Sequence, residues 1–453
     1  MNIPRATIDR VGRQLARRER SCVDLVQAHL AQIEQLDGEL RAWVAVERET
    51  ALEQAEALDC EIAAGKCRGP LHGIPLGIKD IIDVAAWDTR AGSRVLCRRA
   101  ERDAGVVDRL RRAGVVLLGK TVTTEFACFD PPPTRNPWNA ERTPGGSSSG
   151  SAVAVATGMC TAALGSQTGG SITRPASYCG VAGLKPTIGR VSTRGVVPVS
   201  HTLDHVGVIA RSVADLGAVY NAIAGFDVDD PWSVDVPTDR YVPSAHTAET
   251  APPRLGVIEG FLRDAADEAV RAVTDLAVER LREAGAHVDI VALPERFADV
   301  IAMHRRIMAA EAAACHRKSF PDRRDEYGEK VASLLDEGWA TSSTDYAEAL
   351  AHRQGLRRDL DRLSWPYDAL VTPATTTTAP STATTGDARF NAPWSYSGLP
   401  TVSLPCGLAE DGLPVALQLV GGAYSEPRLL GVGQWCESQL PLAPSPPQYG
   451  ASE

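Results

Sequence analysis

Hydrophobic positions along the chain recur at two spacings, and each spacing predicts a different kind of element. Between residues 21 and 36, one face of a helix capped by Ser21 would be formed by Leu25, Val26, Leu30, Ile33 and Leu36. Further helical patterns cover residues 48–64, 106–113, about 264–285 and segments between 296 and 363. Short apolar runs predict strands at residues 115–118, 255–258, 287–293, 369–371, 401–404 and 415–420.

Strands that alternate with helices along most of the chain predict an α/β fold. The sheet should be large and mixed, with mostly parallel strands, and covered by helices on both faces. The polar, proline-containing stretch 226–254 interrupts the alternation and is a candidate insertion or hinge. The chain ends in a proline-rich segment, residues 439–453, which we expect to be disordered.

The overall charge argues against several classes of partner. The 453 residues include 47 Lys and Arg against 57 Asp and Glu, a net charge of −10. This acidic balance argues against nucleic acid or an anionic membrane surface as the main partner. No apolar run approaches the roughly 20 residues of a membrane span, and the N-terminus shows no secretion signal. We therefore expect a cytoplasmic protein with no membrane attachment.

The ten cysteines and nine histidines show no spacing typical of a metal site. The cysteines stand singly, without the C-x2-C pairs of zinc and redox sites. In a cytoplasmic chain they should be reduced residues of the core, and we expect no metal.

Two familiar motifs are present but lack the context that each requires. Residues 114–121, Gly-Val-Val-Leu-Leu-Gly-Lys-Thr, fit a phosphate-binding loop, yet the four residues between the glycines are apolar and should pair within a sheet. Residues 146–150, Gly-Ser-Ser-Ser-Gly, fit the nucleophile elbow of α/β-hydrolases, with Ser148 as nucleophile. That elbow must follow a buried strand, which residues 135–144 cannot form. Ser148 and Ser149 are instead expected to support a helix N-terminus, and the elbow remains a rival hypothesis.

A glycine- and serine-rich region, residues 144–175, carries the most informative chemistry. Such a composition is often a flexible linker. Here, however, apolar residues at 152–156 and 162–164 flank two glycine-rich turns and place them between buried elements. The first turn should open a helix and the second should follow a strand. Two such turns in one core, each ending on serine, are what an anion site built from backbone N–H groups needs.

Several ordered motifs give the chain a close resemblance to the amidase signature family. They are Gly73-Ile-Pro-Leu-Gly-Ile-Lys79-Asp80, Thr124-Glu-Phe-Ala127, Arg135-Asn-Pro-Trp-Asn139, Gly145-Gly-Ser-Ser148, Gly165-Ser-Gln-Thr-Gly-Gly-Ser171, Cys179-Gly-Val-Ala-Gly-Leu-Lys-Pro-Thr187 and Gly398-Leu-Pro-Thr-Val-Ser-Leu-Pro-Cys-Gly407. The resemblance covers roughly residues 20–437, with the variable stretch 226–365 loosely matched. It implies one signature domain, residues 67–438, preceded by a helical segment, residues 1–66.

Catalysis in this family runs through a Ser–cisSer–Lys triad without a cofactor. The resemblance makes Ser171 the nucleophile, Ser147 the bridging serine after a cis peptide bond, and Lys79 the base. It assigns the oxyanion hole to the N–H groups of Thr168, Gly169, Gly170 and Ser171. Physical chemistry supports these roles, because a serine hydroxyl needs an adjacent base and a lysine acts as one only when burial depresses its pKa.

At two positions the chain departs from the commonest family pattern. Gln167 stands where many members have aspartate, and Thr173 where many have arginine, with Arg174 one residue later. This variant resembles malonamidase-like members, small-amide hydrolases in which that arginine contacts a substrate carboxylate. Gln167 and Arg174 are therefore candidate substrate-binding residues. Arg174 would hold a carboxylate through two hydrogen bonds, or alternatively pack its stem beneath the loop.

Two aromatic residues, Phe129 and Trp394, are further candidates for the substrate pocket. In the variable stretch, pocket residues are sought among His304, Arg305, Arg306, Glu311 and Trp339. The resemblance implies an amidase that cleaves a small carboxamide or ureide through an acyl-enzyme on Ser171 and releases ammonia or an amine. The alternatives are the glutaminase subunit of a tRNA-dependent amidotransferase and a biuret- or allophanate-type ureide hydrolase. The oligomeric state is not determined by the sequence, and a homodimer is one possible assembly.

Overall fold

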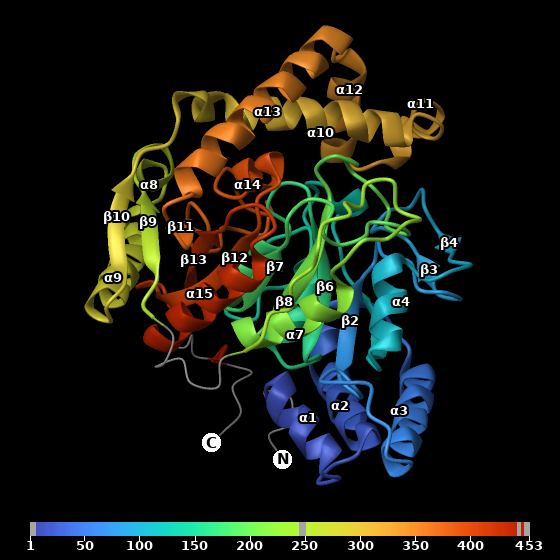
Figure 1. Cartoon of the computed structure of the whole chain (residues 1–453). Helices are drawn as coiled ribbons and strands as arrows, with labels where there is room; N and C mark the ends of the chain where they lie inside the picture. The colour runs from blue at the N-terminus through green and yellow to red at the C-terminus, as the bar shows by residue number, and fades with distance from the viewer. Residues whose placement is uncertain (1–5, 244–250, 442–444, 448–453) are drawn as a thin grey trace.

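Eleven strands form one mixed sheet that runs across the molecule in this computed structural model (Figure 1). The structure describes residues 6–243, 251–441 and 445–447. In spatial order the strands are β1 (Trp43–Val46), β5 (Val116–Thr121), β2 (Pro75–Lys79), β6 (Ala162–Gln167), β8 (His205–Ala210), β7 (Ala182–Lys185), β12 (Thr401–Leu408), β13 (Pro414–Val420), β11 (Ala369–Pro373), β9 (Arg254–Ile258) and β10 (His287–Val291). Every residue of β2, β6, β8 and β13 is buried, so both faces of the sheet's centre are covered. The predicted large mixed α/β sheet is confirmed.

The sheet is less parallel than the sequence predicted. Among the described residues, four neighbouring strand pairs are parallel and six are antiparallel. β12 and β13 are joined by so short a connection that only a hairpin can link them, which makes the pair antiparallel. The expectation of mostly parallel strands was therefore wrong, because it rested on alternation with helices, and the central strands are not all separated by helices.

The N-terminal segment contains three helices, α1 (Ile8–Ala16), α2 (Cys22–Leu40) and α3 (Arg48–Ala63). Ser21 caps α2 as predicted: its side chain accepts the Asp24 N–H, and the Asp24 side chain accepts the Ser21 N–H. The segment is nevertheless not purely helical, because β1 pairs antiparallel with β5 at the edge of the main sheet. A strand of four residues is too short to reveal its period in the sequence.

Among the described residues, eight further helices lie between or beside the strands. They are α4 (Gly105–Arg112), α5 (Ser149–Ala156), α6 (Thr173–Cys179), α7 (Val213–Ile223), α8 (Phe261–Asp264), α9 (Glu268–Glu283), α14 (Ala392–Ser397) and α15 (Glu426–Gln439). The long helix predicted over about 264–285 corresponds to α9, and the short α8 precedes it. Asp267 separates the two, because its backbone is extended and its side chain caps α9 at the Val270 N–H.

A helical layer from the variable stretch covers one end of the sheet. It consists of α10 (Val300–His316), α11 (Phe320–Arg323), α12 (Glu329–Ala340) and α13 (Ser343–Ser364), at the top of Figure 1. A small hairpin of β3 (Asp88–Thr89) and β4 (Arg98–Arg99) lies on the opposite side of the molecule from β10. The helical layer is the part of the variable stretch that reaches the site described below.

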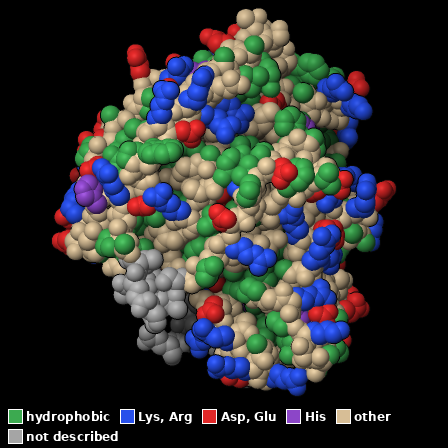
Figure 2. Space-filling model, in the orientation of Figure 1, with side chains coloured by type: hydrophobic (Ala, Val, Ile, Leu, Met, Phe, Trp, Pro, Cys, Tyr) green, Lys and Arg blue, Asp and Glu red, His purple; other side chains and the backbone are tan. Residues whose placement is uncertain are grey.

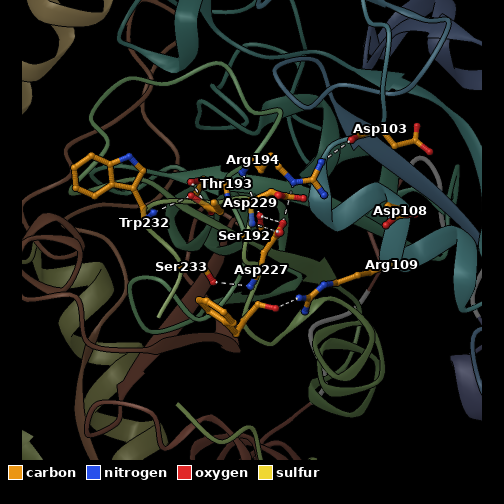
Figure 3. Close-up of polar contacts among 12 residues, drawn as sticks. Asp103, Asp108, Arg109, Ser192, Thr193, Arg194, Asp227, Asp229, Trp232 and Ser233 are labelled. Atoms are coloured by element: carbon orange, nitrogen blue, oxygen red, sulfur yellow. Dashed lines mark hydrogen bonds and ion pairs between the residues drawn. The ribbon is translucent and has the colours of Figure 1, made fainter. Parts of the chain in front are cut away.

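Polar contacts tie the start of the candidate hinge to the core (Figure 3). Asp227 accepts hydrogen bonds from Ser192 Oγ at 2.7 Å and Arg194 Nε at 3.0 Å. The Arg109 guanidinium donates to the carbonyl oxygen of Phe226 at 2.7 Å. Residues 226–233 are therefore anchored rather than free. Residues 244–250 of the same stretch, and residues 442–444 and 448–453 of the predicted tail, lie outside the described residues.

The outer surface carries mixed charge. On the face shown in Figure 2, Lys and Arg side chains are interspersed with Asp and Glu rather than gathered into one basic patch. In the described part of the chain, no helix combines the length and apolar character needed to cross a membrane.

Candidate active site

The candidate active site lies where two neighbouring parallel strands, β2 and β6, reach their carboxyl ends. Lys79 is the last residue of β2, and Ser166 and Gln167 are the last two residues of β6. The glycine-rich turn 145–148 leads into α5, and the turn 168–171 follows β6, as the sequence predicted. Because parallel strands end at the same edge of a sheet, the lysine and both turns meet there.

Lys79 is fully buried among hydroxyl groups. Its Nζ lies within hydrogen-bond distance of three serine hydroxyls: Ser147 Oγ at 2.6 Å, Ser166 Oγ at 2.8 Å and Ser148 Oγ at 3.0 Å. No carboxylate of the described residues forms an ion pair with it. Burial lowers the pKa of Lys79 well below its ordinary value of 10.5, against a smaller opposing effect of the Asp204 charge. The lowered pKa favours the neutral amine, whose lone pair can accept a hydrogen bond from one of these hydroxyls while its two N–H groups donate to the others.

The two glycine-rich turns are joined through their serines. The Gly146–Ser147 peptide bond is cis, and the Ser148 N–H donates to the Ser171 carbonyl oxygen at 3.2 Å. Ser147 and Ser148 are completely buried, whereas the Ser171 side chain lines a cavity and its hydroxyl has no hydrogen bond to another described residue. Lys79 and Ser147 therefore lie together in the interior, and Ser171 borders the cavity.

Ser148 acts differently from the sequence expectation. It occupies the N-cap position of α5 but makes no side-chain capping bond. Its hydroxyl instead accepts the Lys79 amine and the Ser166 N–H, and donates to the Ser166 carbonyl at 3.2 Å. In the part of the chain that the structure describes, no strand leads directly into the turn 145–148, so the context of a nucleophile elbow is absent. Residues 116–121 of the phosphate-loop pattern form β5.

The turn 168–171 borders the cavity. Thr168, Gly169, Gly170 and Ser171 all line it. Within the described residues, the N–H groups of Gly169, Gly170 and Ser171 donate no hydrogen bond. Buried N–H groups are nearly always paired in proteins, so unpaired donors beside a serine hydroxyl fit an anion-binding role.

The cavity above Ser171 encloses about 680 Å³, counting its open mouth. Besides the turn, its lining comprises Ala127, Cys128, Phe129, Arg174, Val199, Ile301, His304, Arg305, Met308, Asp387, Ala388, Arg389 and Ala392. Arg305 pairs with Glu337, and Arg389 pairs with Asp387. Three arginines against one aspartate in the lining give the cavity a net positive charge, which favours an anionic ligand.

Arg174 is the buried arginine of this lining, 4% exposed. Its Nη2 donates to the Gly146 carbonyl oxygen at 2.8 Å and to Thr385 Oγ1 at 3.3 Å, while its Nε has no partner. Burial lowers its pKa, and no carboxylate of the described residues pairs with it. Its position fits both of the roles left open by the sequence, because it contacts the Gly146 carbonyl and also borders the cavity.

Two of the substrate-binding candidates lie outside this lining. Gln167 is buried, and both polar atoms of its amide are hydrogen-bonded: Oε1 accepts the N–H groups of Ile172 and Thr173, and Nε2 donates to Ser395 Oγ at 3.2 Å. Trp394 is buried against Phe297. The side chains of Gln167 and Trp394 contact other parts of the protein and not the cavity. Phe129 and Arg174 border the cavity as expected.

The variable stretch contributes fewer residues than the sequence suggested. His304 and Arg305 line the cavity, but Arg306, Glu311 and Trp339 do not. Glu311 instead accepts hydrogen bonds from Ser200 and Thr202. Among the described residues, no group of three or more His, Cys, Asp or Glu side chains is arranged to hold a metal ion.

Three residues of the site were not selected by sequence reasoning: Ser166, Asp204 and Ser395. Asp204 accepts hydrogen bonds from Thr168 Oγ1 at 2.5 Å and from the N–H groups of Val199 and Ser200. Burial raises the pKa of Asp204 to about 6. Ser166 lies inside a recognised motif, so the sequence could have identified it as a site residue. No pattern in a single sequence identifies Asp204 or Ser395.

Comparison with known proteins agrees with this geometry. The family model described as Amidase matches residues 24–430. A glutamyl-tRNA(Gln) amidotransferase subunit of Chloroflexus aggregans is 36% identical over 94% of this chain and 95% of its own length. The peptide amidase of Stenotrophomonas maltophilia superposes with a TM-score of 0.85 at 33% identity, over 98% of each chain. A structure described as a vestigial protein complex that reveals the evolutionary origins of an s-triazine catabolic enzyme reaches a TM-score of 0.90 at 32% identity, over 96% of this chain and all of that one.

The match extends over nearly the whole chain and includes the segments that bear the lysine and the two serines. The family predicted from the ordered motifs is therefore confirmed. The chain belongs to the amidase signature family, and its chemistry is amidase-type hydrolysis of a carbon–nitrogen bond.

Proposed function

We propose that the protein is a serine amidase that cleaves a small linear carboxamide or ureide through an acyl-enzyme on Ser171. The observation that carries the proposal is the buried Lys79, which lies 2.6 Å from Ser147 Oγ, has no carboxylate partner in the described chain and has a pKa well below its ordinary value because of burial. A lysine in such surroundings has the lone pair that a general base requires. We place the enzyme in the cytoplasm, consistent with its reduced cysteines.

The first half of the reaction uses the whole serine–lysine chain. Ser171 Oγ bonds to the amide carbon while its proton passes to Ser147 and the Ser147 proton passes to Lys79. The carbonyl oxygen becomes an oxyanion, which the unpaired N–H groups of the turn 168–171 stabilise. The Lys79 proton then returns through Ser147 to the leaving nitrogen, the C–N bond breaks, and ammonia or an amine departs.

The second half repeats these steps with water as nucleophile. Water loses a proton to the Ser147–Lys79 pair and attacks the acyl carbon, and the ester bond to Ser171 breaks. The proton returns to Ser171 and a carboxylic or carbamic acid is released. No cofactor enters either half.

Asp204 provides a prediction on pH dependence. Its charge raises the pKa of Lys79, so Asp204→Asn is expected to lower that pKa and move the acidic limb of kcat/KM to lower pH. An asparagine that flips its amide still accepts the Val199 and Ser200 N–H groups and donates to Thr168. The wild-type profile, measured above about pH 6 where Asp204 is ionised, is the reference. A limb that moved to higher pH would contradict this coupling.

Arg174 provides a prediction on substrate class. Arg174→Lys is expected to raise KM for carboxylate-bearing amides such as malonamate by about 10–100-fold, because lysine cannot form the bidentate pair. KM for neutral amides of similar size should change less than about threefold. Steady-state kinetics on matched charged and neutral amides provide the internal control. An equal loss on both would assign Arg174 to holding the Gly146 carbonyl rather than the substrate.

Ammonia release and acyl-enzyme trapping test the proposed function together. Purified protein is assayed on simple amides, malonamate, biuret, allophanate and aryl amides, and rapid acid quench followed by peptide mass spectrometry locates the acyl group. Release of ammonia with an acyl adduct on the Ser171 peptide is expected. No hydrolysis by folded protein, or an adduct on Ser148, would contradict the proposal.

The glutaminase role is the second candidate, and the full-length similarity to glutamyl-tRNA(Gln) amidotransferase subunits favours it. In that role the chain would release ammonia from glutamine and depend on partner subunits. Hydrolysis of simple amides by the isolated chain, with no activity on glutamine, would exclude it.

Size-exclusion chromatography of the same preparation tests the proposed homodimer.

A further inference from the structure

Two side chains far away in the sequence hold the carbonyl groups of the turn 168–171. His304 Nε2, on α10, lies 2.9 Å from the Thr168 carbonyl oxygen, 136 positions away. Ser395 Oγ, on α14, donates to the Gly169 carbonyl oxygen at 2.8 Å, 226 positions away. Neither residue contacts Lys79, Ser147 or Ser171 by a hydrogen bond in the described structure.

Fixing these carbonyl groups also fixes the neighbouring N–H groups. A trans peptide unit is planar, and its C=O and N–H point in opposite directions. The Thr168 carbonyl shares its plane with the Gly169 N–H, and the Gly169 carbonyl shares its plane with the Gly170 N–H. Both N–H groups are unpaired within the described residues and border the cavity. The orientation of two candidate oxyanion donors is thus set from the opposite side of the turn.

The chemistry of His304 suits this contact. A carbonyl oxygen only accepts, so Nε2 must carry the proton and Nδ1 is unprotonated. The ring is buried, and burial lowers the pKa of His304 to about 4, reinforced by Arg353 and Arg305, so it is neutral at neutral pH. The glycines make the backbone of this turn flexible. Hydrogen bonds from other parts of the chain are therefore needed to fix the orientation of its peptide groups.

The far end of the turn is anchored separately. Gln167 Oε1 accepts the N–H groups of Ile172 at 2.9 Å and Thr173 at 3.0 Å, and Gln167 Nε2 donates to Ser395 Oγ at 3.2 Å. Ser395 therefore links Gln167 to the Gly169 carbonyl. With Asp204 on the Thr168 hydroxyl, the turn is held at each side while its N–H groups stay unpaired.

We propose that His304 and Ser395 are positioning residues, which orient the Gly169 and Gly170 N–H groups toward the oxyanion formed during amide hydrolysis. This inference rests on the proposed function. It assigns to α10, in the variable stretch, a role in rate as well as in pocket shape. A residue that only packed against the turn would have no need of a donor at Nε2.

The test compares four variants: His304→Leu, which removes the donor, His304→Gln, whose amide nitrogen replaces Nε2, Ser395→Ala, and His29→Leu as control. His29 is an equally buried histidine whose Nδ1 lies 2.8 Å from the Gly158 carbonyl, and its pKa is also lowered to about 4, but it lies outside the site. The labelling rate of Ser171 by a fluorophosphonate, and kcat and KM on the best amide substrate, are measured for folded protein. Thermal unfolding shows whether each variant is folded.

His304→Leu is expected to lower kcat and the labelling rate by about 10–100-fold, with KM changed less than about threefold. His304→Gln should recover most of this loss, Ser395→Ala should lose about 10-fold, and His29→Leu should keep the wild-type rates. Wild-type rates in both His304→Leu and Ser395→Ala would overturn this inference and leave the proposed function intact. Equal losses in His304→Gln and His304→Leu would do the same. Wild-type protein left unlabelled at Ser171 would overturn the proposed function and the inference with it.

Discussion

Replacement of Ser171 by alanine is expected to lower kcat for amide hydrolysis by roughly 10⁴-fold or more. The substitution removes the atom that we propose forms the acyl bond, while the N–H groups of the turn and the rest of the cavity remain. The Ser171 hydroxyl has no hydrogen bond to another described residue, so its loss leaves no buried partner unsatisfied and the unfolding temperature should change little. Steady-state kinetics and a thermal melt measure the two effects.

The matched controls for this variant are other serines of the same turns. Ser149→Ala removes a hydroxyl that makes only long contacts, at 3.4 and 3.5 Å, and should keep fluorophosphonate labelling. Ser148→Ala removes one acceptor from Lys79 and should reduce the rate without abolishing labelling. Labelling that persisted in Ser171→Ala and disappeared in Ser148→Ala would instead support the nucleophile-elbow hypothesis.

Replacement of Lys79 by methionine is expected to lower kcat by roughly 10³–10⁴-fold and to abolish the acidic limb of the pH–rate profile. Methionine keeps most of the length and burial of lysine but has no lone pair that accepts a proton at this pH. In the wild type, kcat/KM should rise with pH as Lys79 loses its proton, and this limb should lie well below pH 10.5, since burial lowers that pKa.

Lys79 should also make the free energy of unfolding depend on pH. Because its pKa is lower in the folded state, the unfolded chain binds more protons, and the free energy of unfolding should rise with pH between the lowered pKa and about 10.5. Lys79→Met should lack this contribution. Lys79→Arg is the control for charge: arginine cannot deprotonate at working pH, so it should be inactive. An active Lys79→Arg would show that charge, rather than basicity, is what the site needs.

The sequence could suggest the lysine and serines of the candidate site because they stand in short ordered motifs. Lys79, Ser147 and Ser171 each lie inside a segment whose neighbours identify it, and the strands that carry them are marked by apolar runs. The glycine-rich turns were also recognisable as parts of a core, since buried elements flank them. What local sequence supplies is the residue and its immediate conformation.

The remaining contacts depend on chain packing. Asp204 and His304 reach Thr168 from a loop and from α10, and Ser395 reaches the same turn from α14. No spacing in the sequence encodes such meetings. The contacts of Gln167 were hidden for the same reason: its motif position suggested the substrate, but its amide bonds to Ile172, Thr173 and Ser395. The antiparallel centre of the sheet likewise follows from strand pairing, which alternation with helices does not reveal.

Helix α10 belongs to the stretch in which the chain is loosely matched to its family, yet His304 and Arg305 of that helix border the cavity. One helix therefore provides both a wall for the substrate and a tie to the Thr168 carbonyl. As the enzyme diverges toward a new amide substrate, single substitutions along α10 can change the cavity lining. A shift of the whole helix would also displace the hydrogen bond between His304 and the Thr168 carbonyl. Such an arrangement favours change by single side chains over change by insertion or deletion, and it narrows the routes by which this enzyme can acquire a new substrate.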